Sequence, residues 1–309
     1  MFDYLRPSTL EEALDALLDA KSKGEKCIVL AGGTDLLARM RRQPIECQTL
    51  LSLVDVLEMK GIRSSGEYTE IGAGTSLHEL ENSPVIRAKF PALSEAASLM
   101  AALQIRNRAT VGGNLCNASP AADLAAPLIV LDAKLRLRCK EGERQIPCQE
   151  FFRGPGLTCL HSHELLTEVV IPQDRESREG RASSYIKFSP RSSVDIALVG
   201  AAAFVGADTQ GVCREVCLAL AGVAPLPFEL KELRNILVGH RLDAVLCEQI
   251  QMQEQIEKIV KSGVWPITDI RGSSDYKARM AVVISKRALQ LAINRCMSSV
   301  SSPRVGKTQ

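Results

Sequence analysis

The sequence predicts an α+β fold in which a domain of two subdomains precedes a smaller α+β domain. Three observations lead to this prediction. Near residue 30 a short apolar strand runs through a glycine pair into a helix, which is typical of a small parallel α/β unit. From Gly61 the apolar runs alternate and are bounded by glycines, as in a mostly antiparallel sheet. A charged segment without apolar residues, 173–181, marks the boundary to the second domain.

The first subdomain, about residues 1–58, begins with an amphipathic helix. Ser8 and Glu11 are predicted to form a capping box at its start, and apolar residues follow at helical spacing. A strand over 27–31, a glycine turn, a helix over 35–42 and an apolar run over 49–56 complete the unit. We expect strands joined in parallel by a crossover helix.

The second subdomain, about residues 59–176, combines strands with short helices. Residues 109–127 follow neither periodicity, so we expect a loop there, and a second loop over 151–156. Strands are predicted over 68–75, 133–139 and 164–172, and helices from Thr75 and over 91–102.

The C-terminal domain is predicted to span 182–295 and to contain a three-stranded antiparallel sheet with helices. The strands are expected over 184–188, 197–205 and 212–221, and the helices over 229–238, 242–260 and 274–295. Residues 296–309 are expected to form a disordered tail.

Composition excludes several classes of protein. A net charge of +2 over 309 residues is too small for a nucleic-acid footprint, which needs basic residues gathered on one face. No apolar run is long enough to span a bilayer, and the N-terminus does not resemble a signal peptide. We therefore expect a cytoplasmic protein without a membrane span.

Two glycine pairs are the most informative local features. The pair at 32–33 joins a strand to a helix N-terminus, where free N–H groups and the helix dipole suit a diphosphate. The pair at 112–113 lets the backbone approach a ligand closely. Tight turns are the alternative for both pairs. Asp55, about twenty residues after the first pair, leaves a degenerate Rossmann motif open.

The two stretches carry a family resemblance. Residues 31–36 are AGGTDL, and residues 104–123 are QIRNRATVGGNLCNASPAAD. Together, in this order and spacing, they resemble the FAD-binding subunit of the molybdenum hydroxylases, the family of xanthine dehydrogenase and aerobic carbon monoxide dehydrogenase. The resemblance covers nearly the whole chain. It implies noncovalent FAD, because the first motif lacks the His or Cys that covalent attachment would need.

The resemblance also implies which residues bind the cofactor. Residues 29–36 should wrap the diphosphate and ribityl region, and residues 110–114 should form a second clamp. Four further side chains, from Met100, Asp123, Leu166 and Lys187, should contact the nucleotide or the ring. The residues are Val29, Leu30, Ala31, Gly32, Gly33, Thr34, Asp35, Leu36, Met100, Thr110, Val111, Gly112, Gly113, Asn114, Asp123, Leu166 and Lys187.

Four of these residues have a second interpretation. Met100 and Leu166 stand at core-like spacings and are also explained by packing alone. Asp123 is placed to cap a helix that begins at Leu124, and Lys187 could lie on a solvated strand face.

The activity implied by the resemblance is an electron relay. A partner subunit with the molybdopterin cofactor oxidises the substrate, a second partner passes electrons through 2Fe-2S centres, and FAD delivers them to NAD or another acceptor. The chain shows neither the cysteine spacing of 2Fe-2S centres nor a molybdopterin site, so both are expected on partners. No nucleophile stands beside a base, so no catalytic residue is identified. The substrate, whether a purine, an aldehyde, carbon monoxide or an N-heterocycle, stays open.

No metal site is predicted on this chain. Ten scattered cysteines, with no Cys-x-x-Cys, are expected to stay reduced. One family branch, the 4-hydroxybenzoyl-CoA reductases, holds an iron–sulfur cluster in an insertion that this sequence lacks, which disfavours a cluster on Cys116, Cys139, Cys148 and Cys159. His161 and His163 have no acidic or thiol partner at ligand spacing, which favours a solvated loop.

Two other functions are considered. A stand-alone flavin reductase or oxidase with the same cofactor fold would need a Ser or Glu proton donor facing the flavin, and the sequence identifies none. A cofactor-free scaffold would keep the glycine pairs only as turns. Flavin absorbance would exclude the cofactor-free scaffold. Copurification with a molybdenum subunit would distinguish the molybdenum hydroxylase subunit from the stand-alone flavin enzyme.

Overall fold

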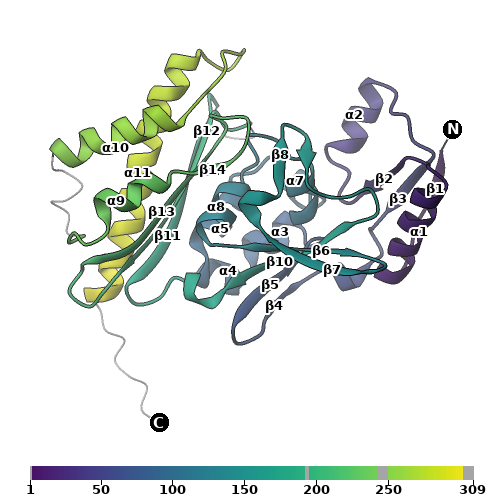
Figure 1. The fold of residues 1–309 in the computed structure, drawn as a ribbon, viewed down its shortest axis with the longest axis horizontal. Coiled ribbons are helices and arrows are strands. Elements are labelled where there is room, and N and C mark those ends of the chain that lie inside the picture. The colour runs from purple at the N-terminus through teal and green to yellow at the C-terminus, as the bar shows by residue number, and fades with distance from the viewer. Residues whose placement is uncertain (1, 192–194, 243–249, 302–309) are drawn as a thin grey trace, which may run out of the picture.

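The computed structural model describes residues 2–191, 195–242 and 250–301. Three sheets follow one another along the longest axis of the molecule in chain order, from the N-terminal strands in purple to the C-terminal helices in yellow (Figure 1). Helices lie between the sheets and on their outer faces. Within the described residues no helix combines the length and apolar character that a membrane crossing requires.

The first sheet is parallel, as predicted, with strand order β1-β3-β2. Its strands are β1 (Asp3–Leu5), β2 (Cys27–Leu30) and β3 (Thr49–Ser52), accompanied by α1 (Leu10–Ser22) and α2 (Leu36–Arg42). The capping box of α1 lies one residue later than predicted. Thr9 Oγ1 accepts the Glu12 amide, and the Glu12 carboxylate accepts the amides of Ser8 and Thr9.

The second sheet is antiparallel, with strand order β4-β5-β10-β6-β7. The strands are β4 (Ile62–Ser64), β5 (Tyr68–Gly72), β6 (Lys134–Cys139), β7 (Gly142–Pro147) and β10 (Leu165–Pro172). A separate two-stranded ribbon, β8 (Phe152–Gly154) and β9 (Leu157–Thr158), begins within the segment predicted as a loop.

Short helices cover this sheet. They are α3 (Leu77–Asn82), α4 (Pro84–Lys89), α5 (Pro91–Ser98), α6 (Leu103–Arg106), α7 (Val111–Cys116) and α8 (Ala125–Val130), with 3-10 turns η1 (Leu57–Met59) and η2 (Cys148–Glu150). Helix α3 is capped by Ser76 rather than Thr75. The predicted helix over 91–102 ends at Ser98, because Ala101 has a left-handed φ of 42° that no helix tolerates.

The third sheet has four antiparallel strands, where the sequence predicted three. They are β11 (Arg181–Phe188), β12 (Val199–Ala207), β13 (Cys213–Ala221) and β14 (Phe228–Glu229). The extra strand is only two residues long, too short for an alternating pattern to reveal. It occupies the start of the helix predicted over 229–238.

The C-terminal helices differ from the prediction at their ends. They are α9 (Arg234–Leu237), α10 (Ile250–Gly263) and α11 (Ser274–Ser301), with 3-10 turns η3 (Gln173–Arg175) and η4 (Lys231–Leu233). The start of the helix predicted over 242–260 falls partly on 243–249, outside the described residues. Residues 296–301, which the sequence assigned to the tail, belong to α11, and Cys296 is fully buried; residues 302–309 lie outside the described residues.

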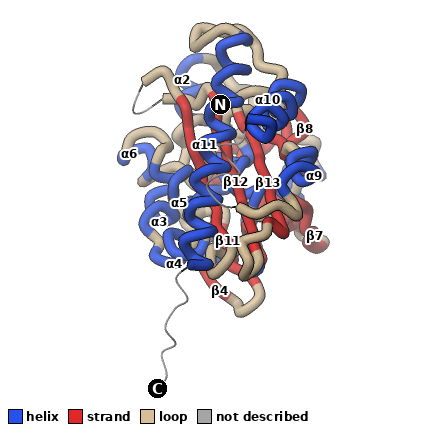
Figure 2. Tube along the Cα trace, turned by 90° about the vertical axis from the view of Figure 1, so that its left-hand side faces the viewer, coloured by secondary structure: helices blue, strands red, loops and turns tan. Residues whose placement is uncertain are grey.

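The third sheet buries both of its faces. Side chains of a strand point alternately to its two faces, and along β12 Ala202 and Phe204 join the core of the N-terminal domain while Ala203 and Val205 join the core beneath α11. Helices α5 and α8 pack on the first face and α11 on the second. Figure 2 shows α11 lying across the strands of this sheet.

Candidate functional site

A cavity of about 570 Å³ opens between the first and second sheets, and both glycine pairs line it. Its volume falls within the range of cofactor and small-molecule sites. Further lining comes from the turn around η1, from residues 73–79, 107–109 and 116–117, from Gly156 and Leu160, and from the start of β10. We call this space the glycine cavity, residues 31–36 the first cradle and residues 110–114 the second cradle.

The first cradle presents unused backbone donors. The amides of residues 32–36 donate no hydrogen bond within the part of the chain that the structure describes. Gly33 has φ +77°, which a residue with a Cβ adopts only with strain. Asp35 is exposed, and the other four residues are half-buried, where amides without partners are rare in folded proteins. The run of open amides therefore indicates a site for an anionic ligand.

The two cradles touch each other. A Cβ on Gly32 would collide with the carbonyl oxygen of Arg108, which stands just before the second cradle. Glycine at this position is therefore required by close backbone contact. Segments about eighty residues apart in the sequence form one continuous wall of the cavity.

The second cradle is a helix start, where the sequence predicted an open loop. Thr110 Oγ1 accepts the Gly113 amide at 3.0 Å and caps α7. The Val111 amide donates to Thr75 O at 3.0 Å and the Gly112 amide to Ala73 O at 2.7 Å. The amides of residues 111–114 are thus already satisfied. Its open group is the side-chain oxygen of Asn114, which is buried and has no partner among the described residues.

Most of the predicted site residues line the cavity. These are Val29, Ala31, Gly32, Gly33, Thr34, Asp35, Leu36, Thr110, Gly112, Gly113, Asn114 and Leu166. The remaining five do not line it: Leu30, Met100, Val111, Asp123 and Lys187. Met100 is buried, and its sulfur accepts the side-chain amide of Asn114 at 3.5 Å, so it supports the second cradle from behind.

Asp123 and Lys187 form a buried ion pair that is bonded to the backbone just before Met100, the residue behind the second cradle. The Lys187 ammonium donates to Asp123 Oδ2 at 3.0 Å and to Leu99 O at 3.2 Å, and the Tyr185 hydroxyl donates to Asp123 Oδ1 at 2.6 Å. Lys187 is therefore not on a solvated face, and Asp123 does not cap α8. Burial raises the pKa of Asp123, opposed by Lys187, and raises the pKa of Tyr185 well above its ordinary value.

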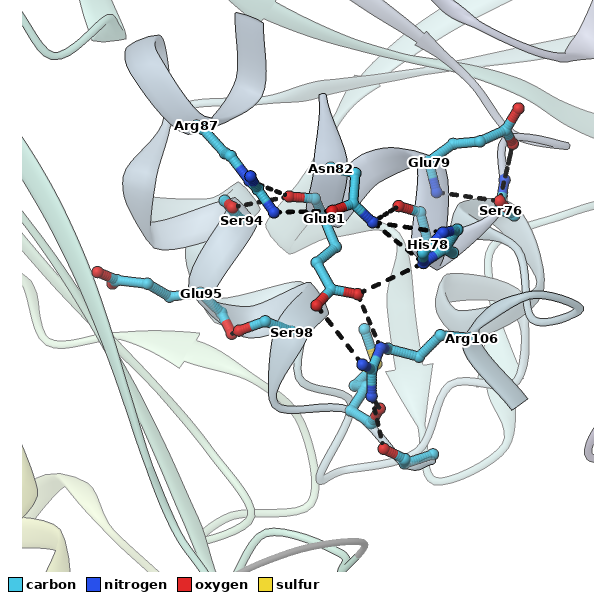
Figure 3. A network of polar contacts seen from close by, with 12 residues as sticks. Ser76, His78, Glu79, Glu81, Asn82, Arg87, Ser94, Glu95, Ser98 and Arg106 are labelled. Carbon is cyan, nitrogen blue, oxygen red and sulfur yellow. Dashed lines mark hydrogen bonds and ion pairs between the residues drawn. The ribbon is translucent and has the colours of Figure 1, made fainter. Parts of the chain in front are cut away.

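Arg106 anchors the segment that leads into the second cradle (Figure 3). Its guanidinium pairs with Glu81 at 2.9 Å and donates to the carbonyl oxygens of Met100 at 3.0 Å and Ala101 at 2.8 Å. This clamp fixes the left-handed turn at Ala101. The arginine stands within the second sequence motif, but the sequence reasoning gave it no role.

Glu164 is a cavity residue that the sequence reasoning missed. The Arg144 guanidinium donates to both carboxylate oxygens of Glu164 at 2.8 Å, and with the His161 amide it lowers the pKa of Glu164 to about 2. Glu79, also at the cavity, is engaged in the cap of α3. Arg39, Lys60 and Arg108 line the cavity as well and give it positive charge.

These features fit a dinucleotide. The open amides of the first cradle and nearby cationic side chains match a diphosphate, and the apolar part of the cavity lining matches a flat ring system. A dinucleotide-binding protein is therefore the class that this fold and this cavity define.

Comparison with known proteins agrees and identifies the family. Residues 1–174 match the family described as "FAD binding domain in molybdopterin dehydrogenase", and residues 184–292 match "CO dehydrogenase flavoprotein C-terminal domain". The chain belongs to the FAD-binding subunits of the molybdenum hydroxylases, the family of the xanthine dehydrogenase and carbon monoxide dehydrogenase flavoproteins, and is thus a subunit of oxidoreductase type.

The relatives match over nearly their whole length. The chain is 33% identical to the carbon monoxide dehydrogenase medium chain of Hydrogenophaga pseudoflava, covering 96% of this chain and 98% of that one. It is 30% identical to the putative xanthine dehydrogenase FAD-binding subunit of Escherichia coli, covering 95% and 97%. A solved carbon monoxide dehydrogenase of H. pseudoflava, which lacks the Mo-pyranopterin moiety, superposes with a TM-score of 0.87 at 30% identity, covering 96% and 98%.

Proposed function

We propose that the chain binds FAD noncovalently in the glycine cavity and relays electrons within a molybdenum hydroxylase complex. The electrons would come from 2Fe-2S centres on one partner, after a partner with the molybdopterin cofactor has oxidised the substrate, and would leave to NAD or another acceptor. The observation that carries this proposal is the run of unpaired amides at residues 32–36 facing a cavity of dinucleotide size.

The residues of the chain have separate roles in this proposal. The first cradle and the cationic side chains beside it would hold the diphosphate. Leu166 and Asn114 would face the ring system, and Asp123 with Lys187 would fix the second cradle from behind. Bound FAD supplies the chemistry that the chain lacks, exchanging single electrons on one side and an electron pair on the other.

A cysteine at the cavity does not change the expectation of noncovalent binding. Cys116 faces the cavity, so its surface is exposed there, while surrounding protein atoms raise the pKa of its thiol to about 12. A thiol with a raised pKa is protonated at neutral pH and is a poor nucleophile.

The serine and the glutamates at the cavity favour a relay subunit over a stand-alone reductase. Ser76 donates its hydroxyl to the Glu79 carboxylate in the cap of α3, and Glu164 is held as a carboxylate by Arg144. A stand-alone enzyme would need a Ser or Glu proton donor turned toward the flavin, and these three residues are engaged within the protein.

Titration of the purified chain with FAD tests the proposal. We expect one FAD per chain, with quenching of flavin fluorescence, and release of unmodified FAD on denaturation. A chain that refuses added FAD would overturn the proposal. Affinity purification from the native host would then separate the two enzyme classes, since a relay subunit carries molybdenum and iron with it and a stand-alone enzyme does not.

A further inference from the structure

Three metal-ligating side chains converge at the edge of the second sheet, away from the first cradle. Cys139 ends β6, Glu141 lies in the turn to β7, and His163 lies just before β10. One ligand atom from each lies within 4.8 Å of the other two. Among the residues that the structure describes, this is the one such group of three.

The donor set suits a borderline-soft divalent cation. A thiolate, an imidazole and a carboxylate are the ligands that Zn²⁺ takes in proteins. Zn–S and Zn–N bonds of about 2.3 Å and 2.0 Å place neighbouring ligand atoms about 3.5 Å apart in a tetrahedral site. The group must therefore close by no more than about 1.3 Å, and Glu141 is on an exposed turn where side-chain rotation suffices.

His163 carries an unused nitrogen. Its Nδ1 is buried and has no hydrogen-bond partner among the described residues. Its Nε2 lies 3.2 Å from the Lys21 ammonium, which can only donate. A bound cation would give His163 a ligand bond, and Lys21, which is exposed, is free to turn toward solvent.

The neighbouring charges permit a cation. Lys140, between the two hairpin ligands, is held away by ion pairs with Glu11 and with Asp15, the latter at 2.7 Å. The ring of His161 stacks on that of His163, with centroids 5.8 Å apart and planes 24° apart. No His161 nitrogen belongs to the group of ligand atoms, so water is left for the fourth position.

We propose that Cys139, Glu141 and His163 form a zinc-type metal site with a fourth position open to water. The site would join the β6–β7 hairpin to the segment that enters β10. Glu164 and Leu166, which line the glycine cavity, follow His163 directly, so the bound ion would brace one wall of that cavity. The proposal does not depend on the cofactor or on the partners.

Metal titration of the full-length, chelator-treated chain tests this site. We expect one Zn²⁺ per chain by calorimetry and a rise in melting temperature with Zn²⁺ concentration. Co²⁺ in place of Zn²⁺ should give a sulfur-to-cobalt charge-transfer band, which reports thiolate ligation.

Substitutions assign the ligands. C139S and H163A should each weaken Zn²⁺ binding at least tenfold and abolish the cobalt band or shift it, and E141Q should weaken binding less. C47S, at a half-buried cysteine outside the group, is the matched control and should bind as the parent does. Zn²⁺ binding that is unchanged in C139S and H163A would overturn the proposal. The absence of a cobalt band in the parent chain would also overturn it, and this test does not require either variant to fold.

Discussion

The two cradles share a Gly-Gly pair but use it in opposite ways. In the first cradle the chain leaves the amides of residues 32–36 unpaired, and Gly33 adopts a left-handed φ that orients them. In the second cradle the amides of residues 111–114 are bonded to Thr75, Ala73 and Thr110, and Gly112 packs against Ala73. The first pair therefore serves the ligand, and the second serves the packing that fixes the adjoining part of the same cavity wall.

The largest expected effect concerns the buried Asp123–Lys187 ion pair, which we propose supports the second cradle from behind. K187M would leave the Asp123 carboxylate buried without its cation, so we expect the free energy of unfolding to fall by about 3 kcal/mol. Urea denaturation of the cofactor-free chain measures it. The double variant D123N/K187M removes both charges and should recover part of the loss. A loss below about 1 kcal/mol would show that the second cradle does not depend on this pair.

Gly112→Ala tests packing in the second cradle directly. The new Cβ would lie 2.7 Å from Ala73 Cβ and 3.0 Å from Ala73 O, which forces α7 away from its neighbour. We expect a loss of about 2 kcal/mol in the free energy of unfolding. Gly142→Ala, where a Cβ meets nothing within 4 Å, is the control and should cost far less. Equal losses would contradict the packing role.

Glu164→Gln tests the part of the cavity lining outside the two cradles that is held by the Arg144–Glu164 ion pair. The folded pKa of Glu164 is lowered from 4.5 to about 2, so its contribution is fully present above pH 4.5 and is lost as the pH falls toward 2. We expect E164Q to be less stable by about 2 kcal/mol at pH 7 and to lose less stability than the parent on acidification. Chemical denaturation across that pH window measures both.

The exposed Glu150 provides the control for this measurement. E150Q should keep the parent's stability at pH 7 and its acid profile. Parallel acid profiles of E164Q and the parent would mean that the Arg144–Glu164 pair does not brace the cavity.

Gly33→Ala has the smallest expected effect on stability and the sharpest effect on the ligand. A Cβ at φ +77° costs about 1 kcal/mol, and its near contacts are only the flexible ends of Leu37 and Leu30. We expect FAD affinity to fall at least tenfold because the amides of the first cradle rotate. Gly24→Ala, at φ +68° in open space, should cost the same stability with no change in FAD affinity. Equal FAD affinities of the Gly33→Ala and Gly24→Ala variants would contradict the ligand-binding role of the first cradle.

Local patterns predicted most of the fold. The strand, glycine turn and helix around residue 32 and the alternation along β6 depend on neighbouring residues, which the sequence displays. Helix α7 was missed because glycines disfavour helices. The Thr110 cap and the tertiary packing of Gly112 on Ala73 outweigh the low helix propensity of glycine.

Contacts between side chains that are far apart in the sequence could not be predicted. Arg144 and Glu164 come from β7 and from the segment before β10, and no periodicity links them. The same holds for His163, which the sequence left without a thiol or acidic neighbour. Cys139 and Glu141 reach it only because β6 pairs with both β7 and β10.

The inner face of the third sheet also bears on how the chain holds together. Ala202, Phe204 and Tyr185 are embedded in the same apolar cluster as α5 and α8, although the charged segment 173–181 separates them in the sequence. Cleavage of the backbone there would leave two fragments still bound through that cluster. The two domains should consequently melt in a single transition, and neither half expressed alone should stay in solution.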